Sequence, residues 1–414
     1  MELSRREFAQ HGLKVMAGSI VVPAFFQRTA LAAEKNPKFT GPLVHPDNIL
    51  VLVQLAGGND GLNTVIPYTE QDYYRFRPTL GISKANALDL DGKIGLHPSM
   101  EGMQKIFNEK KLTVLQGVGY PNSNRSHFKS TDIWMTGNPT KPEGTGWVGR
   151  YLDTINQSKH SFPGISLGSS GERVLKGAKT AVPSFRNLDE FRLFPDEKDM
   201  QKRDRELEVF KALHRKDGGH FAQAGFLQDA SLNAFVSSEN LKSLVGRYQT
   251  RVQYPNNGLG RSLRLAGQMI ASGLNTKAFH VSLGGFDTHS NQANGHANRL
   301  GTLSASLAAF FEDLRAMNKS ERVIVMTYSE FGRRVKENGS KGTDHGSAAP
   351  LFVMGEKIKG SIIGVHPSLT DLRGGDLKYA IDFRSIYSAL LINWLGADPK
   401  EVFGAMFEPV QLFG

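Results

Sequence analysis

Short apolar runs that lead directly into polar, Gly-rich loops recur along this chain and constrain its fold more than any other feature. The runs are rich in β-branched residues, have the length of buried strands, and lie at residues 48–55, 112–120, 277–283 and 323–326. Segments with helical spacing of apolar residues separate several of them. Alternating strands and helices predict an α/β fold with a mostly parallel central sheet and helices on both faces. Such sheets bind ligands beyond the carboxyl ends of their strands.

The segment 322–355 contains the most polar of these strand ends. The run 323–326 leads to Glu330, and a Gly-rich loop then carries Asp344 and His345 before a second apolar run at 351–355. Two neighbouring strands thus deliver one carboxylate and one Asp-His pair to adjacent loops, as in an active site. The alternative is structural: Glu330 caps a helix, and His345 is a turn residue on a solvated loop.

Two further strand ends carry acidic residues. Asp60 follows the run 48–55 in a loop whose glycines let the backbone approach a ligand closely, although Asn-Asp-Gly also forms simple turns. Asp287 and His289 follow the run 277–283 and can together bind one divalent cation, since imidazole and carboxylate both suit zinc or manganese. The alternative is a turn in which Asp287 caps the local backbone.

A serine between the run 112–120 and a predicted helix at 129–136 is the candidate nucleophile. This residue, Ser126, lies between Arg125 and His127. A helix N-terminus offers free amides and a partial positive charge that suit an oxyanion or a phosphate. The alternative is that Ser126 is simply the N-cap of the helix.

Composition excludes several classes of site. Cysteine is absent, which excludes disulfides, thiolate metal sites and cysteine nucleophiles. The formal net charge of +10 favours anionic substrates or polyanionic surfaces. The basic residues are scattered and accompany no nucleic-acid-binding motif, so nucleic acid is not an expected partner.

The N-terminus has the features of an export signal. Arg5 and Arg6 precede a modestly apolar stretch at 13–26, and Ala-Leu-Ala at 30–32 gives a small-x-small cleavage pattern. The arginine pair resembles a twin-arginine signal, which predicts the twin-arginine export machinery as a partner and a periplasmic or secreted location. The alternative is a membrane anchor, but glycine and proline interrupt a stretch that is already too short to span a bilayer. After processing, no stable membrane span is expected.

These patterns divide the chain into a signal peptide at 1–33, a linker at 34–47 and a single α/β domain at 48–414. Within that domain, residues 187–272 are charged and helix-prone. Charge runs of this kind are typical of a solvated face. We therefore expect a helical insertion or layer beside the sheet.

The loop sequences resemble those of a known family. They are GGNDG at 57–61, PNSNRSHF at 121–128, GGFDTHSN at 284–291, TYSEFGR at 327–333 and GTDHGSAAPLFVMG at 342–355. Over nearly the whole mature chain, these motifs resemble the DUF1501 family of exported bacterial proteins, which often carry twin-arginine signals. That family is similar in fold to the alkaline phosphatase and sulfatase superfamily. The resemblance therefore implies an alkaline phosphatase-like domain.

For metals, the resemblance implies a two-cation site. In the superfamily, one metal is held by an Asp and a His from one loop and by a late His, which here match Asp287, His289 and His345. The other metal takes an early Asp, the nucleophile and an Asp-His pair, and its first three places here match Asp60, Ser126 and Glu330. Glu330 stands in place of the usual Asp and Phe331 in place of the usual His, which leaves open a one-metal or metal-free protein.

Two functions follow as expectations. The first is an exported metal-dependent hydrolase or transferase that acts on phosphate or sulfate esters, with an anionic small molecule or glycan ester as substrate. Ser126 attacks, Arg125 and divalent ions (zinc or manganese, with calcium as a third option) stabilise the developing charge, and His127 orients the leaving group. The second is a non-catalytic periplasmic or surface binding protein on a degenerate phosphatase-like scaffold, which Phe331 in place of a ligand favours.

Overall fold

The computed structural model describes residues 41–155, 162–168, 172–180, 182–187 and 245–414. The expected signal peptide, residues 34–40 of the expected linker and residues 188–244 of the expected helical segment lie outside these ranges. Within the described residues, no helix is both long and apolar enough to cross a membrane.

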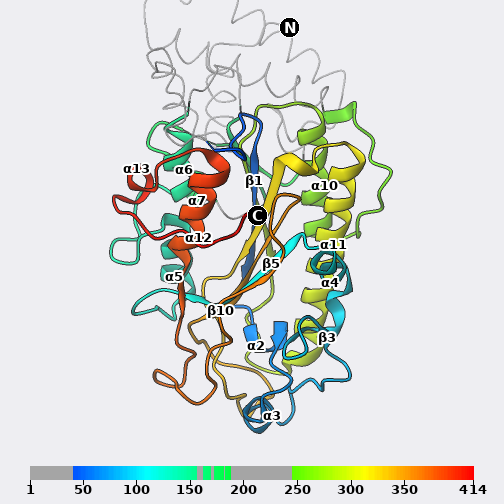
Figure 1. Cartoon of the computed structure of the whole chain (residues 1–414), viewed down its shortest axis with the longest axis vertical. Helices are drawn as coiled ribbons and strands as arrows, with labels where there is room; N and C mark the ends of the chain where they lie inside the picture. Colours follow the sequence, from blue (N-terminus) through cyan, green and yellow to red (C-terminus); the bar gives the residue numbers. More distant parts are fainter. Residues whose placement is uncertain (1–40, 156–161, 169–171, 181, 188–244) are drawn as a thin grey trace, which may run out of the picture.

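A central sheet of nine strands organises the described part of the chain (Figure 1). Its main path runs, in spatial order, through β11 (Ile362–Ile363), β5 (Leu112–Gly119), β10 (Ala349–Met354), β9 (Val323–Tyr328), β1 (Ile49–Ala56), β8 (Ala278–Gly284), β6 (Gly164–Leu167) and β7 (Ser184–Phe185). The short strand β12 (Ile381–Asp382) also pairs with β5. The expected α/β fold with a mostly parallel sheet is confirmed.

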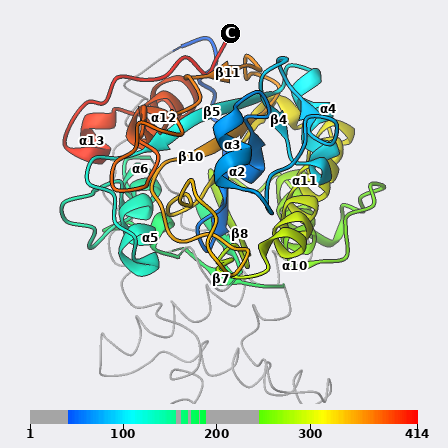
Figure 2. The same ribbon diagram turned by 90° about the horizontal axis from the view of Figure 1, so that it is seen from below.

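One strand, β10, runs against all the others. Its pairings with β5 and β9 are antiparallel, whereas the remaining pairings in this sheet are parallel. Because β10 is reversed, its amino end lies at the same sheet edge as the carboxyl ends of β5, β9, β1 and β8. The loop before β10 therefore meets the loops after four other strands. Figure 2 views the molecule from the end at which this edge lies.

Helices cover both faces of the sheet, as the sequence predicts. Along β1, Val51 and Val53 pack with α4 (Glu101–Asn108), α10 (Gly258–Ala271) and α11 (Gln292–Ala316). Leu50 and Leu52 point to the other face and pack with α5 (His127–Thr136), α6 (Trp147–Leu152), α12 (Phe383–Leu390) and α13 (Pro399–Phe403). The two helical layers lie on opposite sides of the strands in Figure 1. A strand buried on both faces explains why the run 48–55 is almost continuously apolar.

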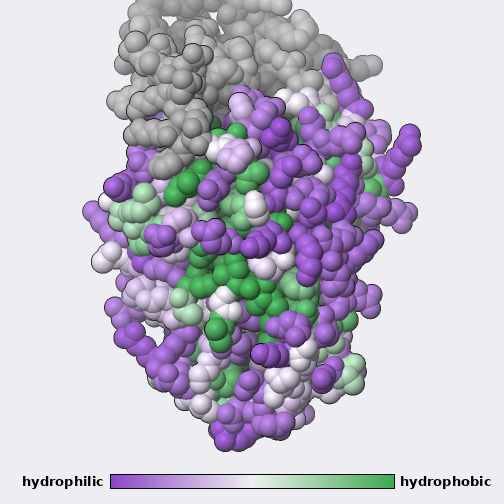
Figure 3. Space-filling view, viewed as in Figure 1, coloured by the Kyte–Doolittle hydropathy of each residue, from purple (hydrophilic) through white to green (hydrophobic). Residues whose placement is uncertain are grey.

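Smaller elements complete the described chain. The short strands β2 (Val65–Ile66), β4 (Gly95–Leu96) and β3 (Leu88–Asp89) form a separate sheet. Short helical segments are α2 (Gly61–Thr64), α3 (Gln71–Phe76), α7 (Glu172–Leu175), the 3-10 turns Pro98–Met100 and Ser320–Arg322, and the π-helical turn Leu391–Leu395 that follows α12. On the face drawn in Figure 3, hydrophobic side chains gather between the two helical layers, and hydrophilic ones cover the flanking helices.

Candidate metal centre

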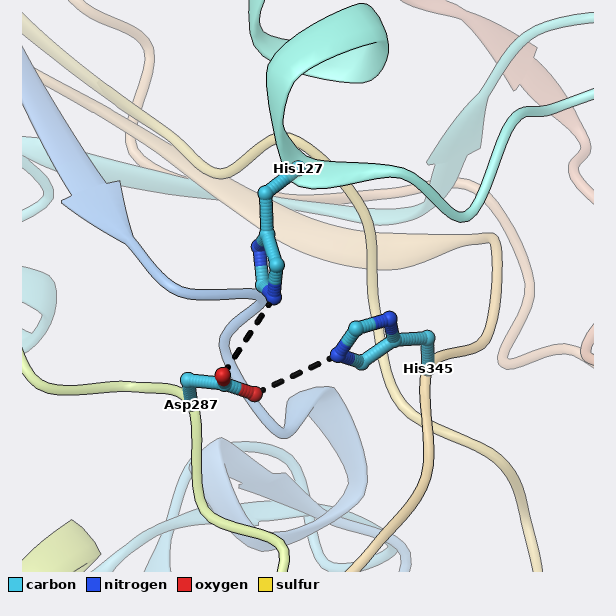
Figure 4. Close-up of side chains that lie close together, drawn as sticks. All are labelled: His127, Asp287 and His345. Atoms are coloured by element: carbon cyan, nitrogen blue, oxygen red, sulfur yellow. Dashed lines mark hydrogen bonds and ion pairs between the residues drawn. The ribbon is translucent and has the colours of Figure 1, made fainter.

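Three side chains from loops far apart in the sequence converge at the edge where β10 begins (Figure 4). His127 opens α5, Asp287 follows β8, and His345 precedes β10. One donor atom from each lies within 4.8 Å of the other two. His127 Nε2 is 3.4 Å from Asp287 Oδ2, and His345 Nε2 is 3.2 Å from Asp287 Oδ1. Side chains of these types at this spacing could hold a metal ion, and we call them, together with His289, the metal-binding group.

His289 adds a fourth side chain to this group. Its Nε2 lies 3.0 Å from Asp287 Oδ1 and 2.9 Å from His345 Nε2. Ligand atoms about 2.0–2.1 Å from a tetrahedral zinc ion are roughly 3.3 Å apart from one another. The mutual spacing of His289, His345 and Asp287 is therefore close to that of three ligands around one zinc ion.

Hydrogen bonds to the opposite ring nitrogens orient all three imidazoles. His127 Nδ1 lies 2.8 Å from Glu330 Oε1, and His345 Nδ1 lies 2.9 Å from the Arg125 carbonyl oxygen. His289 Nδ1 lies 3.4 Å from Asp344 Oδ1. Carbonyl and carboxylate oxygens accept hydrogen bonds, so each Nδ1 carries the proton and donates it. Each neutral ring is then left with its Nε2 lone pair, and all three lone pairs are on the side of Asp287. Histidine ligands of metals are commonly held in this way.

One of these nitrogens has no hydrogen-bond partner at all. Nε2 of His127 is buried and makes no hydrogen bond, and it lies 3.4 Å from Oδ2 of the Asp287 carboxylate, which is also an acceptor. An acceptor nitrogen facing an acceptor oxygen is unfavourable unless a proton or a cation lies between them. A cation bound by both atoms would satisfy this nitrogen, so the side chains present fit a metal ion.

The formal charge of these side chains also fits a divalent cation. Three carboxylates (Asp287, Glu330 and Asp344) contact the imidazoles, and one guanidinium, that of Arg333, contacts Asp287. With neutral imidazoles the group carries a formal charge of −2, which one divalent cation would balance. Partial burial raises the pKa of Asp287, but the hydrogen bond and the positive charge of Arg333 lower it, and the pKa of Asp287 is about 2. The hydrogen bond to Glu330 raises the pKa of His127 against the effect of burial.

Arg333 joins the loops that carry the ligands. Its guanidinium is fully buried and donates to the carbonyl oxygens of Gly58 and Thr343 at 2.7 Å, to that of Phe286 at 3.0 Å and to Asp287 Oδ1 at 2.7 Å. These acceptors belong to the loop after β1, the loop after β8 and the loop before β10. The sequence did not predict this role of Arg333, because most oxygens that accept its hydrogen bonds belong to the backbone, and backbone atoms form no recognisable sequence motif.

Phe331, at the place where the resemblance leads one to expect a histidine, forms a wall of the group. Its buried ring lies 4.8 Å from the ring of His127 and 4.7 Å from that of His345, measured between centroids. It also packs against Gly58, where a Cβ atom would come within 2.4 Å of the phenyl ring. Phe331 thus supplies packing and no ligand. Among the described residues, no second group of three or more His, Asp or Glu side chains has metal-binding spacing.

The structure does not bring Asp60 to this group. Its carboxylate is completely buried and forms a short ion pair with Arg77 and a short hydrogen bond with the amide of Gln292. Burial raises the pKa of Asp60, but the charge and hydrogen bond of Arg77 hold it below its usual value. Asp60 does follow β1 as expected. Arg77 reaches it from the end of α3, in a region whose sequence predicts no regular element.

Glu330 lies behind His127 instead of beside the other ligands. Its buried carboxylate accepts the backbone N–H of Gly57 at 2.8 Å as well as His127 Nδ1–H. The sequence predicted a ligand at this position. In the structure Glu330 contacts His127 Nδ1, and it is His127, predicted to orient a leaving group, whose Nε2 faces Asp287.

Ser126 and Arg125 occupy the turn that leads into α5. Ser126 is the N-cap residue, as the alternative interpretation had it, yet its exposed side chain makes no capping hydrogen bond. The guanidinium of Arg125 contacts Asp376, with Nε 2.9 Å and Nη2 2.5 Å from Oδ2. Only the backbone carbonyl of Arg125 contacts a member of the group, His345.

Comparison with known proteins places the chain in a family. The family model described as "Protein of unknown function (DUF1501)" matches residues 47–405, which confirms the resemblance of the loop motifs. No curated protein matches the chain.

Several solved structures are similar to the chain. The C-terminal periplasmic domain of EcEptC from Escherichia coli, in complex with Zn, is 11% identical, with 79% of this chain and 78% of that chain covered and a TM-score of 0.37. The lipoteichoic acid synthase LtaP from Listeria monocytogenes is 10% identical, with 89% and 76% covered and a TM-score of 0.38. The PsFucS1 sulfatase from Pseudoalteromonas sp. is 11% identical, with 78% and 66% covered and a TM-score of 0.33. Likeness at this level assigns no activity to this chain.

Proposed function

The chain belongs to the DUF1501 family, and from that premise and the geometry of its metal-binding group we propose that it is an exported, metal-dependent hydrolase or transferase that acts on phosphate or sulfate esters. One observation carries the proposal. Three imidazoles, each held through Nδ1 by an oxygen acceptor, turn their Nε2 atoms toward the carboxylate of Asp287. Sites with this design serve metal ions.

His127, Asp287, His289 and His345 would hold the ion. Three imidazole nitrogens and a carboxylate oxygen suit zinc, with manganese as the second choice. Calcium takes oxygen ligands, so this donor set does not support the calcium option. When bound, a divalent ion supplies Lewis-acid polarisation of a phosphoryl or sulfuryl oxygen and offsets charge that develops on it.

Ser126 is the proposed nucleophile. It directly precedes His127 at the N-terminus of α5, and its hydroxyl is exposed and free of a capping bond. In the reaction, a bond forms between Ser126 Oγ and the phosphorus or sulfur atom while the bond to the leaving oxygen breaks. The Ser126 proton passes to solvent, and the leaving oxygen takes a proton from solvent. Water then releases the anion in a hydrolase, or a second alcohol accepts it in a transferase.

The remaining parts of the proposal rest on the sequence. The Arg5-Arg6 pattern supports export to the periplasm or beyond through the twin-arginine machinery. The net charge of +10 supports an anionic ester, either a small molecule or a glycan. Phosphate and sulfate esters share a tetrahedral oxyanion, and both classes therefore belong in the first test.

That test is turnover of aryl phosphate and aryl sulfate esters by the zinc-loaded protein and by its Ser126→Ala variant. Ser123→Ala, in the same loop, is the matched control. We expect turnover of one ester class, a loss of at least ~10³-fold in kcat for Ser126→Ala, and little change for Ser123→Ala. Equal turnover by Ser126→Ala would rule out the serine mechanism. Absence of turnover, with ester binding retained, would favour the non-catalytic binding protein.

A further inference from the structure

A group of arginines lies on the rim of the metal-binding group. The guanidinium of Arg125 contacts Asp376 Oδ2 at 2.5 and 2.9 Å, and Arg334 Nε lies 3.8 Å from Oδ1 of the same carboxylate. The Asp376 side chain is only 6% exposed, whereas those of Arg125 and Arg334 are 41% and 38% exposed. The positive groups therefore face solvent, and the negative one is buried beneath them.

A third arginine belongs to the same turn. Arg373 and Asp376 exchange backbone hydrogen bonds at 3.0 and 3.2 Å. The exposed side chain of Arg373 reaches Asn122, with Nη2 3.0 Å from Oδ1, in the loop that leads to Ser126. We call Arg125, Arg334 and Arg373 the rim arginines. Two of them, Arg125 and Arg334, contact the carboxylate of Asp376, and the four side chains together carry a formal charge of +2.

Backbone contacts tie the rim arginines to the metal-binding group. The carbonyl of Arg125 accepts from His345 Nδ1 at 2.9 Å, and Arg125 immediately precedes Ser126. The backbone N–H of Arg334 donates to the carbonyl of Asp344 at 3.0 Å. Arg125 and Arg334 therefore belong to the same two loops as His127 and His345.

Two glycines leave space beside the rim arginines. A Cβ atom on Gly374 would meet only Arg125 Nη2, at 3.8 Å, and one on Gly375 would meet only Arg334, at 3.5 Å and beyond. The backbone of Gly374 and Gly375 thus lies next to the two guanidinium groups, and neither residue has a side chain to cover them. An oxyanion has room to approach.

We propose that the rim arginines bind a second anionic group of the substrate, so that the ester is multiply phosphorylated or multiply sulfated. This rests on the proposed function for the identity of the first group, the reacting ester. Guanidinium groups match tetrahedral oxyanions with paired N–H donors, and such charge-assisted bonds are about twice as strong as neutral ones. Asp376 orients two guanidiniums while balancing only one of their charges. A substrate with one anionic group gains nothing from these arginines.

The test compares binding of tripolyphosphate and orthophosphate by calorimetry, with the full chain freed of metal by chelator. We expect tripolyphosphate to bind more tightly, Arg334→Gln to weaken it about threefold, and Arg125→Gln with Arg334→Gln to weaken it about tenfold. The matched control, Arg261→Gln with Arg264→Gln, removes the same charge from the exposed face of α10 and should change binding less than twofold. Arg334→Lys keeps the charge and should retain part of the affinity. Disulfated and monosulfated monosaccharides form a parallel pair of probes, which distinguishes sulfate from phosphate recognition.

Equal tripolyphosphate affinity in wild type and in Arg334→Gln would overturn the proposal. That single variant leaves the Arg125 to Asp376 contact in place, so the fold should survive the change. Arginine-dependent binding in metal-free protein would support the proposal even if no metal or esterase activity were found. Failure of this inference would appear as arginine-independent binding of tripolyphosphate, whereas failure of the proposed function would appear as absence of ester turnover.

Discussion

The hydrogen bond between His127 Nδ1 and Glu330 determines which nitrogen of His127 is free to bind a cation. Glu330 also accepts the N–H of Gly57, so its carboxylate is fixed from two sides. A carboxylate in this place both selects the tautomer and increases the basicity of the opposite nitrogen. In the proposed metal site, Glu330 therefore orients a ligand without being one.

Replacement of this carboxylate should weaken the metal site while leaving its ligands in place. We expect Glu330→Gln to lower zinc affinity by roughly 10- to 100-fold, the usual effect of losing such a partner. A titration with a competing chelator measures it. Glu312→Gln, an exposed change on α11, is the control and should have no effect. Unchanged affinity in Glu330→Gln would show that this hydrogen bond does not tune the site.

Substitution of Asp60 distinguishes its role as the ion-pair partner of Arg77 from the metal-ligand role that the sequence predicted. Removal of one partner from a buried pair leaves an unbalanced charge and costs about 3–5 kcal/mol. We therefore expect Asp60→Asn to lower the free energy of unfolding by about that amount, because Arg77 loses its counter-charge. Denaturant unfolding measures it. Metal content of the folded variant should equal that of wild type, and loss of metal without loss of stability would restore Asp60 as a ligand.

Among elements, β10 and α11 contribute most to the arrangement of the site. The reversed direction of β10 puts the loop carrying Asp344 and His345 at the carboxyl edge of its parallel neighbours. At the start of α11, Gln292 accepts from the hydroxyls of Thr288 and Thr343 at 3.0 and 2.6 Å. Thr288 lies between Asp287 and His289, and Thr343 lies two residues before His345, so α11 fixes the two loops relative to each other.

The buried face of α11 also makes stability depend on pH. Burial lowers the pKa of His296 to about 4, and that of the neighbouring His97 likewise. Between about 6.5, the unfolded value, and about 4, the unfolded chain binds protons that the folded chain does not. Stability is therefore full above pH 6.5 and falls as the pH drops toward 4.

The His296→Gln variant checks this origin. Its amide can still donate to Asn59, the acceptor that lies 3.0 Å from His296 Nε2, but it does not titrate. The free energy of unfolding, measured by denaturant for wild type and variant across pH 4 to 6.5, should therefore decline less in the variant. The two declines should differ by on the order of 3 kcal/mol at pH 4. Parallel curves would assign the acid sensitivity to other groups.

Pattern and periodicity were sufficient to predict the elements that bear the site. Runs such as 48–55 and 277–283 are apolar because both faces of their strands are buried, and this fixed where Asp287 and His289 would lie. The direction of β10 was not predictable, since an apolar run is the same read in either direction. The ion pair of Asp60 with Arg77 was not predictable either, because no motif links these two residues and they meet only in the folded chain.

At the scale of the whole molecule, the residues that stabilise the fold and the polar residues of the candidate site lie on different parts of the sheet. Its two apolar faces pack against helices, and the polar loops gather at one edge, where the ligands, Ser126 and the rim arginines share neighbouring segments. His127 illustrates why the site could be predicted only in part. The sequence placed it in the correct loop, but its role follows from Glu330, more than two hundred residues away.

The most direct test of the proposed metal centre is the zinc content of the full chain, purified without strong chelator. Wild type is compared with His345→Ala, which removes one of the four donors, and with His45→Ala, which removes a histidine outside the group. We predict about one equivalent of zinc in wild type and in His45→Ala after dialysis against a weak chelator, and roughly a tenth of that or less in His345→Ala. No bound metal in wild type, or equal zinc in all three proteins, would contradict the account.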